Sequence, residues 1–224
     1  MTATRRLGAP ESKTRVLLLD AAERLLLRDG YAAVTSRRVA AEAGLKPQLI
    51  HYYFRTMDDL FLEVYRRRAE QGIERFATAI EVHRSLRTVW RFGTDLRGAA
   101  FNIEFVALAN HRKAIRDEIA RYARRFREMQ LDAITAILED LGVPPDICPP
   151  IVVLLAMTGV TQVMALETAL GVTTGHRETM DFVDSWIDKG ERDLGAEQER
   201  RRDSADVPTP MAFRAGAVSE EGSS

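Results

Sequence analysis

The chain of 224 residues has little of what many folds and sites require. It holds a single cysteine, Cys148, which excludes an intramolecular disulfide framework and a metal site built from several thiolates. No segment alternates apolar and polar residues in the way that a half-buried strand does. The N-terminal stretch is polar and basic, which is not the pattern of a secretory signal. We therefore expect a protein of the reducing cytoplasm, with an apolar fraction of 46% from which to build a core.

Patterns that carry enzyme chemistry are also missing. The sequence has no glycine-rich phosphate loop, no nucleophile elbow and no cluster of histidines and cysteines at metal-ligand spacing. Its four histidines, His51, His83, His111 and His176, are scattered singly along the chain. The sequence thus predicts that the protein is not an enzyme and that it has no catalytic residue, metal or cofactor.

The net charge of −1 conceals an uneven distribution. Residues 1–55 contain ten Lys or Arg against five Asp or Glu, whereas the remaining 169 residues contain 22 against 28. A basic N-terminal quarter on an acidic body favours contact between that quarter and a polyanion, although an excess of this size also arises by chance.

Apolar residues recur at steps of three and four, which predicts an all-α protein of about nine helices. The first helix is expected from about residue 12 to Gly30. Its inward-facing residues are expected to be Leu18, Ala21, Ala22, Leu25 and Leu26. Thr35 is a suitable N-cap for a second helix, and Thr56 and Asp59 have the spacing of a capping box. The other helices are expected over about 36–43, 47–53, 57–80, 85–98, 100–110, 113–141, 149–170 and 177–194.

The run Ile147–Leu166 has no charged residue and is long enough to cross a membrane. Pro149 and Pro150 at its start, Gly159 and Gln162 further on, and the lack of a flanking basic cluster argue against such a span. We expect a helix that is buried between other helices or subunits, and no contact with a membrane.

A short helix, a turn at Gly44 and a second short helix predict a helix-turn-helix over residues 35–54. Lys46 suits a phosphate or a guanine edge, Gln48 suits adenine, and Leu49 suits a thymine methyl group. Hydroxyl, imidazole and guanidinium groups suit phosphates. The candidate DNA contacts are Ser36, Arg37, Arg38, Lys46, Gln48, Leu49, His51, Tyr52 and Tyr53. Of the two tyrosines, Tyr52 is the weaker candidate, with inward packing as the alternative to a DNA contact. The arginine row 66–68 is expected to be a solvated face.

These residues lie in a longer pattern that resembles the TetR family of bacterial transcriptional regulators. The resemblance covers about residues 12 to 62 and is dense enough to be specific. It is carried by Arg15, Leu18–Ala22, Leu25, Leu26, Gly30, Tyr31, Val34–Ala40, Ala43–Leu45, Ile50–Phe54, Asp59 and Leu60. It adds Pro47 to the DNA contacts. The chain departs from the family at Gln48, His51 and Met57, where a small residue, a tyrosine and a lysine are usual.

The resemblance implies an organisation and a function. We expect a flexible N-terminal arm over residues 1–11 and a DNA-binding domain of three helices over 12–62. A larger helical domain for effector binding and dimerisation is expected over 63–200, and the composition predicts a disordered tail over 201–224. The implied function is that of a ligand-responsive repressor that binds a palindromic operator on double-stranded DNA as a homodimer and is released by a small-molecule effector.

The last two long helices each carry more apolar surface than one flank needs, so they are expected to form the dimer interface. The candidate interface residues are Ile151, Leu155, Gln162, Val183, Trp186 and Ile187. The alternative is that these helices only complete the core of the monomer.

The effector pocket is expected between the helices from about 85 to 170. Its candidate residues are Trp90, Phe92, Phe101, Phe105, Asn110 and Met157. Aromatic and methionine residues at helical spacing also form ordinary cores. The rival to a regulator is a helical protein-interaction module with a degenerate DNA-binding head, although Arg37, Lys46 and Gln48 together argue against it.

Overall fold

The computed structural model of the chain describes residues 12–205, and within them it describes every side chain except those of 96, 97, 191 and 194–205. This part of the chain contains nine α-helices, one short 3-10 helix and no strand, which confirms the predicted all-α fold. The helices are α1 (Lys13–Asp29), η1 (Tyr31–Ala33), α2 (Ser36–Glu42), α3 (Gln48–Tyr53), α4 (Met57–Val82), α5 (Leu86–Gly93), α6 (Leu96–Ala109), α7 (Lys113–Asp140), α8 (Pro150–Ala169) and α9 (His176–Ala205).

Two predicted segments fall at the limits of this description. The predicted arm, residues 1–11, lies outside the described residues, as do residues 206–224 of the predicted tail. The last helix continues to Ala205, beyond the position at which the composition turns polar.

The local sequence rules explain how the first helices begin and end. Helix α1 ends at Gly30, whose φ of 77° lies in the left-handed region that favours glycine. The Thr35 hydroxyl accepts a hydrogen bond from the Arg38 N–H at the start of α2. At the start of α4, the Asp59 N–H donates to the Thr56 hydroxyl at 3.0 Å, and the Thr56 N–H donates to the Asp59 carboxylate at 3.1 Å. This reciprocal pair is the predicted capping box.

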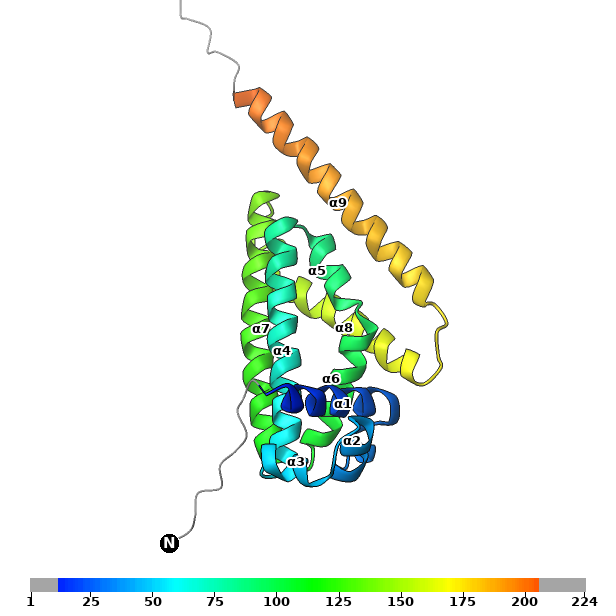
Figure 1. Cartoon of the computed structure of the whole chain (residues 1–224). Helices are drawn as coiled ribbons and strands as arrows, with labels where there is room; N and C mark the ends of the chain where they lie inside the picture. The colour runs from blue at the N-terminus through cyan, green and yellow to red at the C-terminus, as the bar shows by residue number, and fades with distance from the viewer. Residues whose placement is uncertain (1–11, 206–224) are drawn as a thin grey trace, which may run out of the picture.

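The long helices α4 and α7 lie side by side along the molecule, and α1 to α3 lie at one end of them (Figure 1). Helix α6 packs against α1, η1, α7 and α8, so it contacts both the first helices of the chain and the later helix α8. Helix α9 follows the outside of the body and contacts it through α5 (Figure 1). We call α1 to α3 with the start of α4, residues 12–62, the head.

Buried apolar side chains form two clusters. The boundary between the clusters does not coincide with residue 62, where the DNA-binding domain is predicted to end. The first cluster joins the head to α4, α6 and α7, and it includes Leu18, Ile50, Phe61 and Phe105. The second lies between the C-terminal part of α4 and helices α5, α7, α8 and α9. The head therefore shares its core with α6, and its orientation depends on that packing.

The arginine row of α4 is not the solvated face that the sequence predicts. The Arg67 guanidinium donates to Asp20 at 2.6 Å and to Glu23 at 2.9 Å, and Arg68 donates to Glu23 at 2.8 Å. These bonds tie α4 to α1. The sequence pattern did not reveal them because the carboxylate partners are more than forty residues away.

Two helix boundaries also differ from the prediction. The break between α5 and α6 falls at Thr94 and Asp95 instead of near residue 99. The Asp95 carbonyl accepts from the Ala99 N–H at 3.0 Å, which begins α6 earlier than the apolar periodicity suggests. Local hydrogen bonds therefore decide this boundary.

An acid-sensitive ion pair joins α4 to α7, and it yields a testable prediction. Glu118 on α7 accepts from Arg66 on α4 at 2.6 Å and from Arg121 at 2.7 Å. The hydrogen bond from Arg121, and then that from Arg66, lowers the pKa of Glu118 from its ordinary value of 4.5 to about 2. Because the folded pKa is depressed, the carboxylate stabilises the folded state above about pH 4.5, and this contribution is lost as the pH falls toward 2.

We predict that Glu118→Gln lowers the free energy of unfolding at pH 7 by about 1 kcal/mol, because the amide has no charge for the two guanidinium groups. Urea unfolding at a series of pH values should show this difference from wild type shrinking between pH 4.5 and 2. Glu128→Gln, at an exposed position on the same helix, is the control and should leave the difference near zero. A deficit that is the same at every pH would contradict the assignment.

Candidate functional site

The turn between α2 and α3 is fixed by its own backbone. Gly44, with φ of 67°, follows α2, and its N–H donates to the Ala41 carbonyl at 3.1 Å. The Leu45 N–H donates to the Ala40 carbonyl at 2.8 Å, so the pair of bonds is a Schellman motif with glycine at its left-handed position. A β-carbon at Gly44 would meet no neighbouring atom within 4 Å, so the requirement for glycine comes from the backbone conformation alone.

Helix α3 has one buried face and one exposed face. Ile50 and Phe54 are fully buried in the core cluster that also contains Val39 and Leu26. The opposite side presents cationic, amide, imidazole and phenol groups to solvent. Its exposed residues are Lys46, Pro47, Gln48, His51 and Tyr52, and Leu49 beside them is half-buried. Apart from Tyr53, the predicted contact residues from Lys46 onward therefore lie on one accessible surface, which we call the α3 face.

The two arginines of α2 have different surroundings. Arg37 is exposed, and Ser36 beside it is half-buried. The Arg38 guanidinium forms an ion pair with Asp29 at the end of α1. Arg28 also donates to Asp29, at 3.2 Å, and this bond lowers the pKa of the Asp29 carboxyl. Arg38 is thus held at the outer edge of α1 and α2, whereas Arg37 is free of any ion pair within the described part of the chain.

Of the two tyrosines of α3, Tyr53 and not Tyr52 packs inward. Tyr52 is 44% exposed, while Tyr53 is half-buried against the core cluster of the head. The rings meet edge to face with centroids 4.9 Å apart, and the Tyr53 hydroxyl lies 2.9 Å from the Ser12 hydroxyl. The side chain of Tyr53 therefore links the end of α3 to the start of α1.

One candidate residue escaped the sequence analysis. Arg55, between α3 and α4, is exposed and has no ion pair within residues 12–205. It directly precedes the N-cap of α4, so a second unpaired cation lies next to the α3 face. The sequence did contain a signal for this residue, because Arg55 is a basic residue between a predicted helix end and a predicted capping box.

A carboxylate on α6 holds the turn at the end of α1. The Glu104 carboxylate accepts a hydrogen bond from the Tyr31 N–H at 2.8 Å. A β-carbon at Gly30 would lie 3.3 Å from the same carboxylate, so the lack of a side chain there permits the close approach. Nearby, the Arg68 guanidinium lies over the Phe101 ring of α6 at 5.3 Å. These contacts position the head relative to α6.

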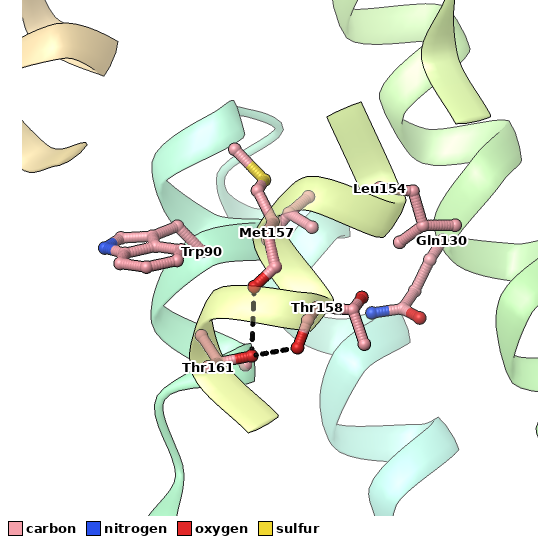
Figure 2. Close-up of a pocket in the computed structure, with 8 residues that line it drawn as sticks. Trp90, Gln130, Leu154, Met157, Thr158 and Thr161 are labelled. Atoms are coloured by element: carbon pink, nitrogen blue, oxygen red, sulfur yellow. Dashed lines mark hydrogen bonds between the residues drawn. The ribbon is translucent and has the colours of Figure 1, made fainter. Parts of the chain in front are cut away.

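A small cavity lies between α5, α7 and α8, and its volume of about 10 Å³ is roughly the room for one water molecule. Its lining residues are Val89, Trp90, Gly93, Gln130, Leu154, Met157, Thr158 and Thr161. Figure 2 shows Met157 and Thr161 on α8 between the Trp90 ring and the Gln130 amide. The Thr161 hydroxyl donates to carbonyls of its own helix at 3.1 Å. The Trp90 indole N–H is buried without a hydrogen-bond partner, and in Figure 2 it lies on the side of the ring away from Gln130.

Only two of the residues predicted for an effector pocket, Trp90 and Met157, line this cavity. Phe101 and Phe105 are fully buried in the cluster that joins the head to α6, where both rings contact Tyr65. The remaining two lie elsewhere: Phe92 packs between Phe76 and Phe126, and Asn110 is exposed at the end of α6. Periodicity marked the aromatic residues as inward-facing but could not distinguish a packed ring from a cavity wall.

Helices α8 and α9 leave an apolar surface exposed. Among the residues predicted for a dimer interface, Leu155 is 48% exposed and Trp186 is 56% exposed, and Ile151 and Gln162 are exposed as well. Val183 is half-buried and Ile187 is buried in the second core cluster, so these two hold α9 to its own body. Further exposed apolar residues on the same two helices are Val152, Val163, Leu166 and Phe182. We call this exposed set the α8–α9 face.

Helix α8 is the one helix of the described part that has the length and apolar character to cross a membrane, and 22% of its most apolar window is buried. Its buried residues, among them Thr161, pack against the body, and α8 contacts α5, α6 and α7. Residues 12–205 contain no group of three or more His, Cys, Asp or Glu that could hold a metal ion.

The head matches a known family. Residues 18–64 match the family model described as bacterial regulatory proteins, tetR family. No curated protein matches the chain significantly. The sequence match covers the helix-turn-helix and the start of α4, which is the region that carries the α3 face.

Solved structures extend the likeness to the rest of the fold. A TetR transcription regulator from Haloarcula marismortui, 19% identical, has a TM-score of 0.62, and the match covers 79% of this chain and 97% of that one. A protein from Saccharomonospora viridis, assigned as a transcriptional regulator and solved in complex with choline, is 18% identical with a TM-score of 0.63 over 84% and 97% of the two chains. The fatty acid degradation regulator FadR from Bacillus halodurans is 11% identical with a TM-score of 0.58 over 83% and 96%. At these identities the likeness is one of fold.

The bond between Glu104 and Tyr31 gives the prediction of this section. We predict that Glu104→Ala lowers the free energy of unfolding by about 1–3 kcal/mol, because the half-buried Tyr31 N–H loses its acceptor. Amide hydrogen exchange should become faster at Tyr31. Glu104→Gln keeps an oxygen acceptor and should restore most of the protection, and Asn102→Ala, at an exposed position on α6, is the control. Unchanged exchange at Tyr31 in Glu104→Ala would show that the bond does not hold the turn.

Proposed function

We propose that the chain is a ligand-responsive transcriptional repressor of the TetR family of bacterial regulatory proteins, whose family model matches residues 18–64, and that it binds a palindromic operator as a homodimer. Proteins of this family are DNA-binding transcription factors and not enzymes. The observation that carries the proposal is the α3 face: a short, rigidly braced helix whose exposed side holds the groups that recognise base edges and phosphates.

The chemistry of the α3 face fits the major groove of DNA. Gln48 has the amide that pairs with the N6 and N7 edge of adenine, and Lys46 has the cation that reaches guanine or a phosphate. Neither side chain has a partner within the described residues, so neither must break a protein contact to bind DNA. His51 and Tyr52 lie on the same exposed side. We propose that Lys46 and Gln48 read the operator.

Phosphate contacts would hold α3 in the groove. Arg37 and Arg55 flank the α3 face and lack ion pairs within the described chain. Arg55 lies two residues before Met57, the position at which the family usually has lysine, so we propose that Arg55 supplies the phosphate contact there. We propose that Arg38 mainly stabilises the head, since it forms an ion pair with Asp29.

Dimerisation follows from the small size of the α3 face. One short helix contacts few base pairs, whereas two heads about 34–36 Å apart read two half-sites on one side of the duplex. The α8–α9 face is the best candidate for the interface, because its large apolar side chains are exposed on adjacent helices without a covering element. A two-fold axis through this face would require a palindromic operator.

Release by an effector needs a connection between its pocket and the head. We propose that the effector binds between α5, α7 and α8, where the cavity of about 10 Å³ must widen as these helices separate to admit it. Helix α6 contacts α8 on one side and both α1 and η1 on the other. A ligand that prefers a different arrangement of α8 and α6 would thus act on the head through the bond between Glu104 and Tyr31, and would weaken DNA binding by linkage. A protein with this role works in the cytoplasm.

The DNA contact is tested by a salt titration of operator binding. Purified protein is titrated against DNA from upstream of its own gene by fluorescence anisotropy, and a regulator should show log affinity falling steeply and linearly with log salt. We predict that the double variant Lys46→Ala, Gln48→Ala lowers specific affinity at least tenfold, at about 1–3 kcal/mol for each lost base contact, without changing thermal stability.

The matched control removes one cation elsewhere. Arg127→Ala, at an exposed position on α7 that has no ion pair within the described residues, should leave operator affinity within twofold. Intact specific binding in the double variant would show that α3 does not read the operator. No binding to any upstream fragment at low salt would favour the rival proposal of a protein-interaction module with a degenerate head.

The dimer interface is tested by placing a charge on the α8–α9 face. We predict that Leu155→Asp converts the dimer to a folded monomer in sedimentation velocity and abolishes binding to a full palindrome, because burying an unpaired carboxylate is costly. Val82→Asp puts the same charge at another exposed apolar residue, at the end of α4, and should remain a dimer. A monomeric wild-type protein at micromolar concentration would refute this part of the proposal.

A further inference from the structure

The α3 face carries one side chain of a type that changes its charge near neutral pH, the imidazole of His51. His51 is exposed and makes no hydrogen bond or ion pair with the other described residues. Histidine side chains have an ordinary pKa of about 6.5. A neutral imidazole has one N–H donor and one acceptor, whereas an imidazolium has two donors and a positive charge. On the premise that the α3 face binds DNA as proposed above, the groups around α3 determine which of the two forms binds.

Every carboxylate of the head, residues 12–62, already has a partner in the described chain. The six acidic residues of the head are Asp20, Glu23, Asp29, Glu42, Asp58 and Asp59. The first four pair with arginines of α1, α2 or α4. Asp58 pairs with Arg112 before α7, and Asp59 accepts the N–H bond of its capping box. Glu63, directly after the head, pairs with Arg15 of α1 at 2.6 Å. These residues therefore leave no unpaired anion for His51.

The unpaired charged groups on the elements around α3 are cations. Helix α3 lies at the end of the molecule, beside α2 (Figure 1). Arg37 on α2, Lys46 before α3 and Arg55 after it are exposed and form no ion pair within the described chain. Lys13, at the start of α1, is exposed in the same way. In the unbound protein, an imidazolium at His51 would thus join a set of positive charges and gain no anionic partner from residues 12–205.

Double-stranded DNA supplies the anions that the head withholds. Its phosphates place one negative charge on about every 1.7 Å of the duplex axis. An opposite charge within about 4–6 Å favours the charged form of a titratable group, and a charge-assisted hydrogen bond is roughly twice as strong as a neutral one. Binding of the α3 face to DNA would therefore favour the imidazolium. By linkage, protonation of the imidazole must then strengthen DNA binding by the same factor.

We propose that His51 binds DNA as an imidazolium, which takes one proton from the solvent as the complex forms and donates an N–H to an acceptor on the DNA. That acceptor is a phosphate oxygen or the O6 and N7 edge of guanine. Operator affinity then rises as the pH falls. A contact that favours the imidazolium about tenfold makes the affinity about sixfold weaker per head at pH 8 than at pH 6, given the ordinary titration of histidine.

Substitutions at His51 test the proton linkage. The full-length protein is titrated against DNA from upstream of its own gene by fluorescence anisotropy at pH 6, 7 and 8 and constant ionic strength. Both His51→Gln and His51→Lys should lose the pH dependence, the first with weak binding at each pH and the second with tight binding. His83→Gln, at an exposed position at the far end of α4, is the control and should keep it. A pH dependence that survives in His51→Gln would overturn the proposal.

Calorimetry counts the protons directly. Titrations at pH 7 in phosphate and in Tris, whose enthalpies of ionisation differ, should show the uptake of about half a proton per head in the wild type and none in His51→Gln. A duplex of equal length and shuffled sequence identifies the acceptor. The same pH dependence on this duplex assigns the contact to a phosphate, and a dependence confined to the upstream DNA assigns it to guanine. No proton uptake by the wild type would overturn the proposal.

The two proposals fail in different ways. Specific binding to upstream DNA at pH 8, where a free imidazole is neutral, tests the regulator without the proton linkage. A protein that binds this DNA equally well at pH 6 and pH 8 refutes only the imidazolium contact. A protein that binds no upstream DNA at any pH refutes the proposed function.

Discussion

The packing of the head against α6 is the constraint on which the rest of the structure depends. Leu18 of α1, Ile50 of α3 and Phe105 of α6 belong to one continuous buried cluster, so the head does not close a core of its own. Since burial of large apolar side chains is the main stabilising contribution, separating the head from α6 would expose part of that cluster. The direction in which α3 points is therefore set by helices that follow it in the chain.

Polar contacts then refine what the apolar cluster allows. The carboxylate of Glu104 at the Tyr31 N–H and the paired arginines of α4 fix the angle between the head and the long helices. Such hydrogen bonds require a specific geometry, so they exchange partners only when the helices move relative to one another. A shift of α6 would reach the head through the Glu104 carboxylate. The direction of the α3 face thus depends on where α6 lies.

On the α8–α9 face, large apolar side chains stay exposed instead of packing into a core. Ile187 and Val183 attach α9 to the second core cluster, while Trp186 and Phe182 on the same helix stay exposed. A helix that is apolar on two sides has one side for its own body and one for another surface. The apolar run that makes α8 long enough for a membrane has the same origin, because its buried residues pack on the body, where α8 contacts α5, α6 and α7, while several of its other apolar residues stay exposed.

The sequence alone determined the local structure of this protein. Caps such as Thr35 and Thr56, the glycine at position 44 and the 3.6-residue period depend on neighbours a few residues apart, so the helices, the turn and the exposed side of α3 were predictable. Tertiary structure decided what depends on distant partners. Packing against α1 sets the partners of Arg67 and Arg68 and the half-buried position of Tyr53 beside Ser12. The packing of the later helices separates Trp90 from Phe101 and Phe105. Contacts between residues so far apart leave no periodic pattern in the sequence.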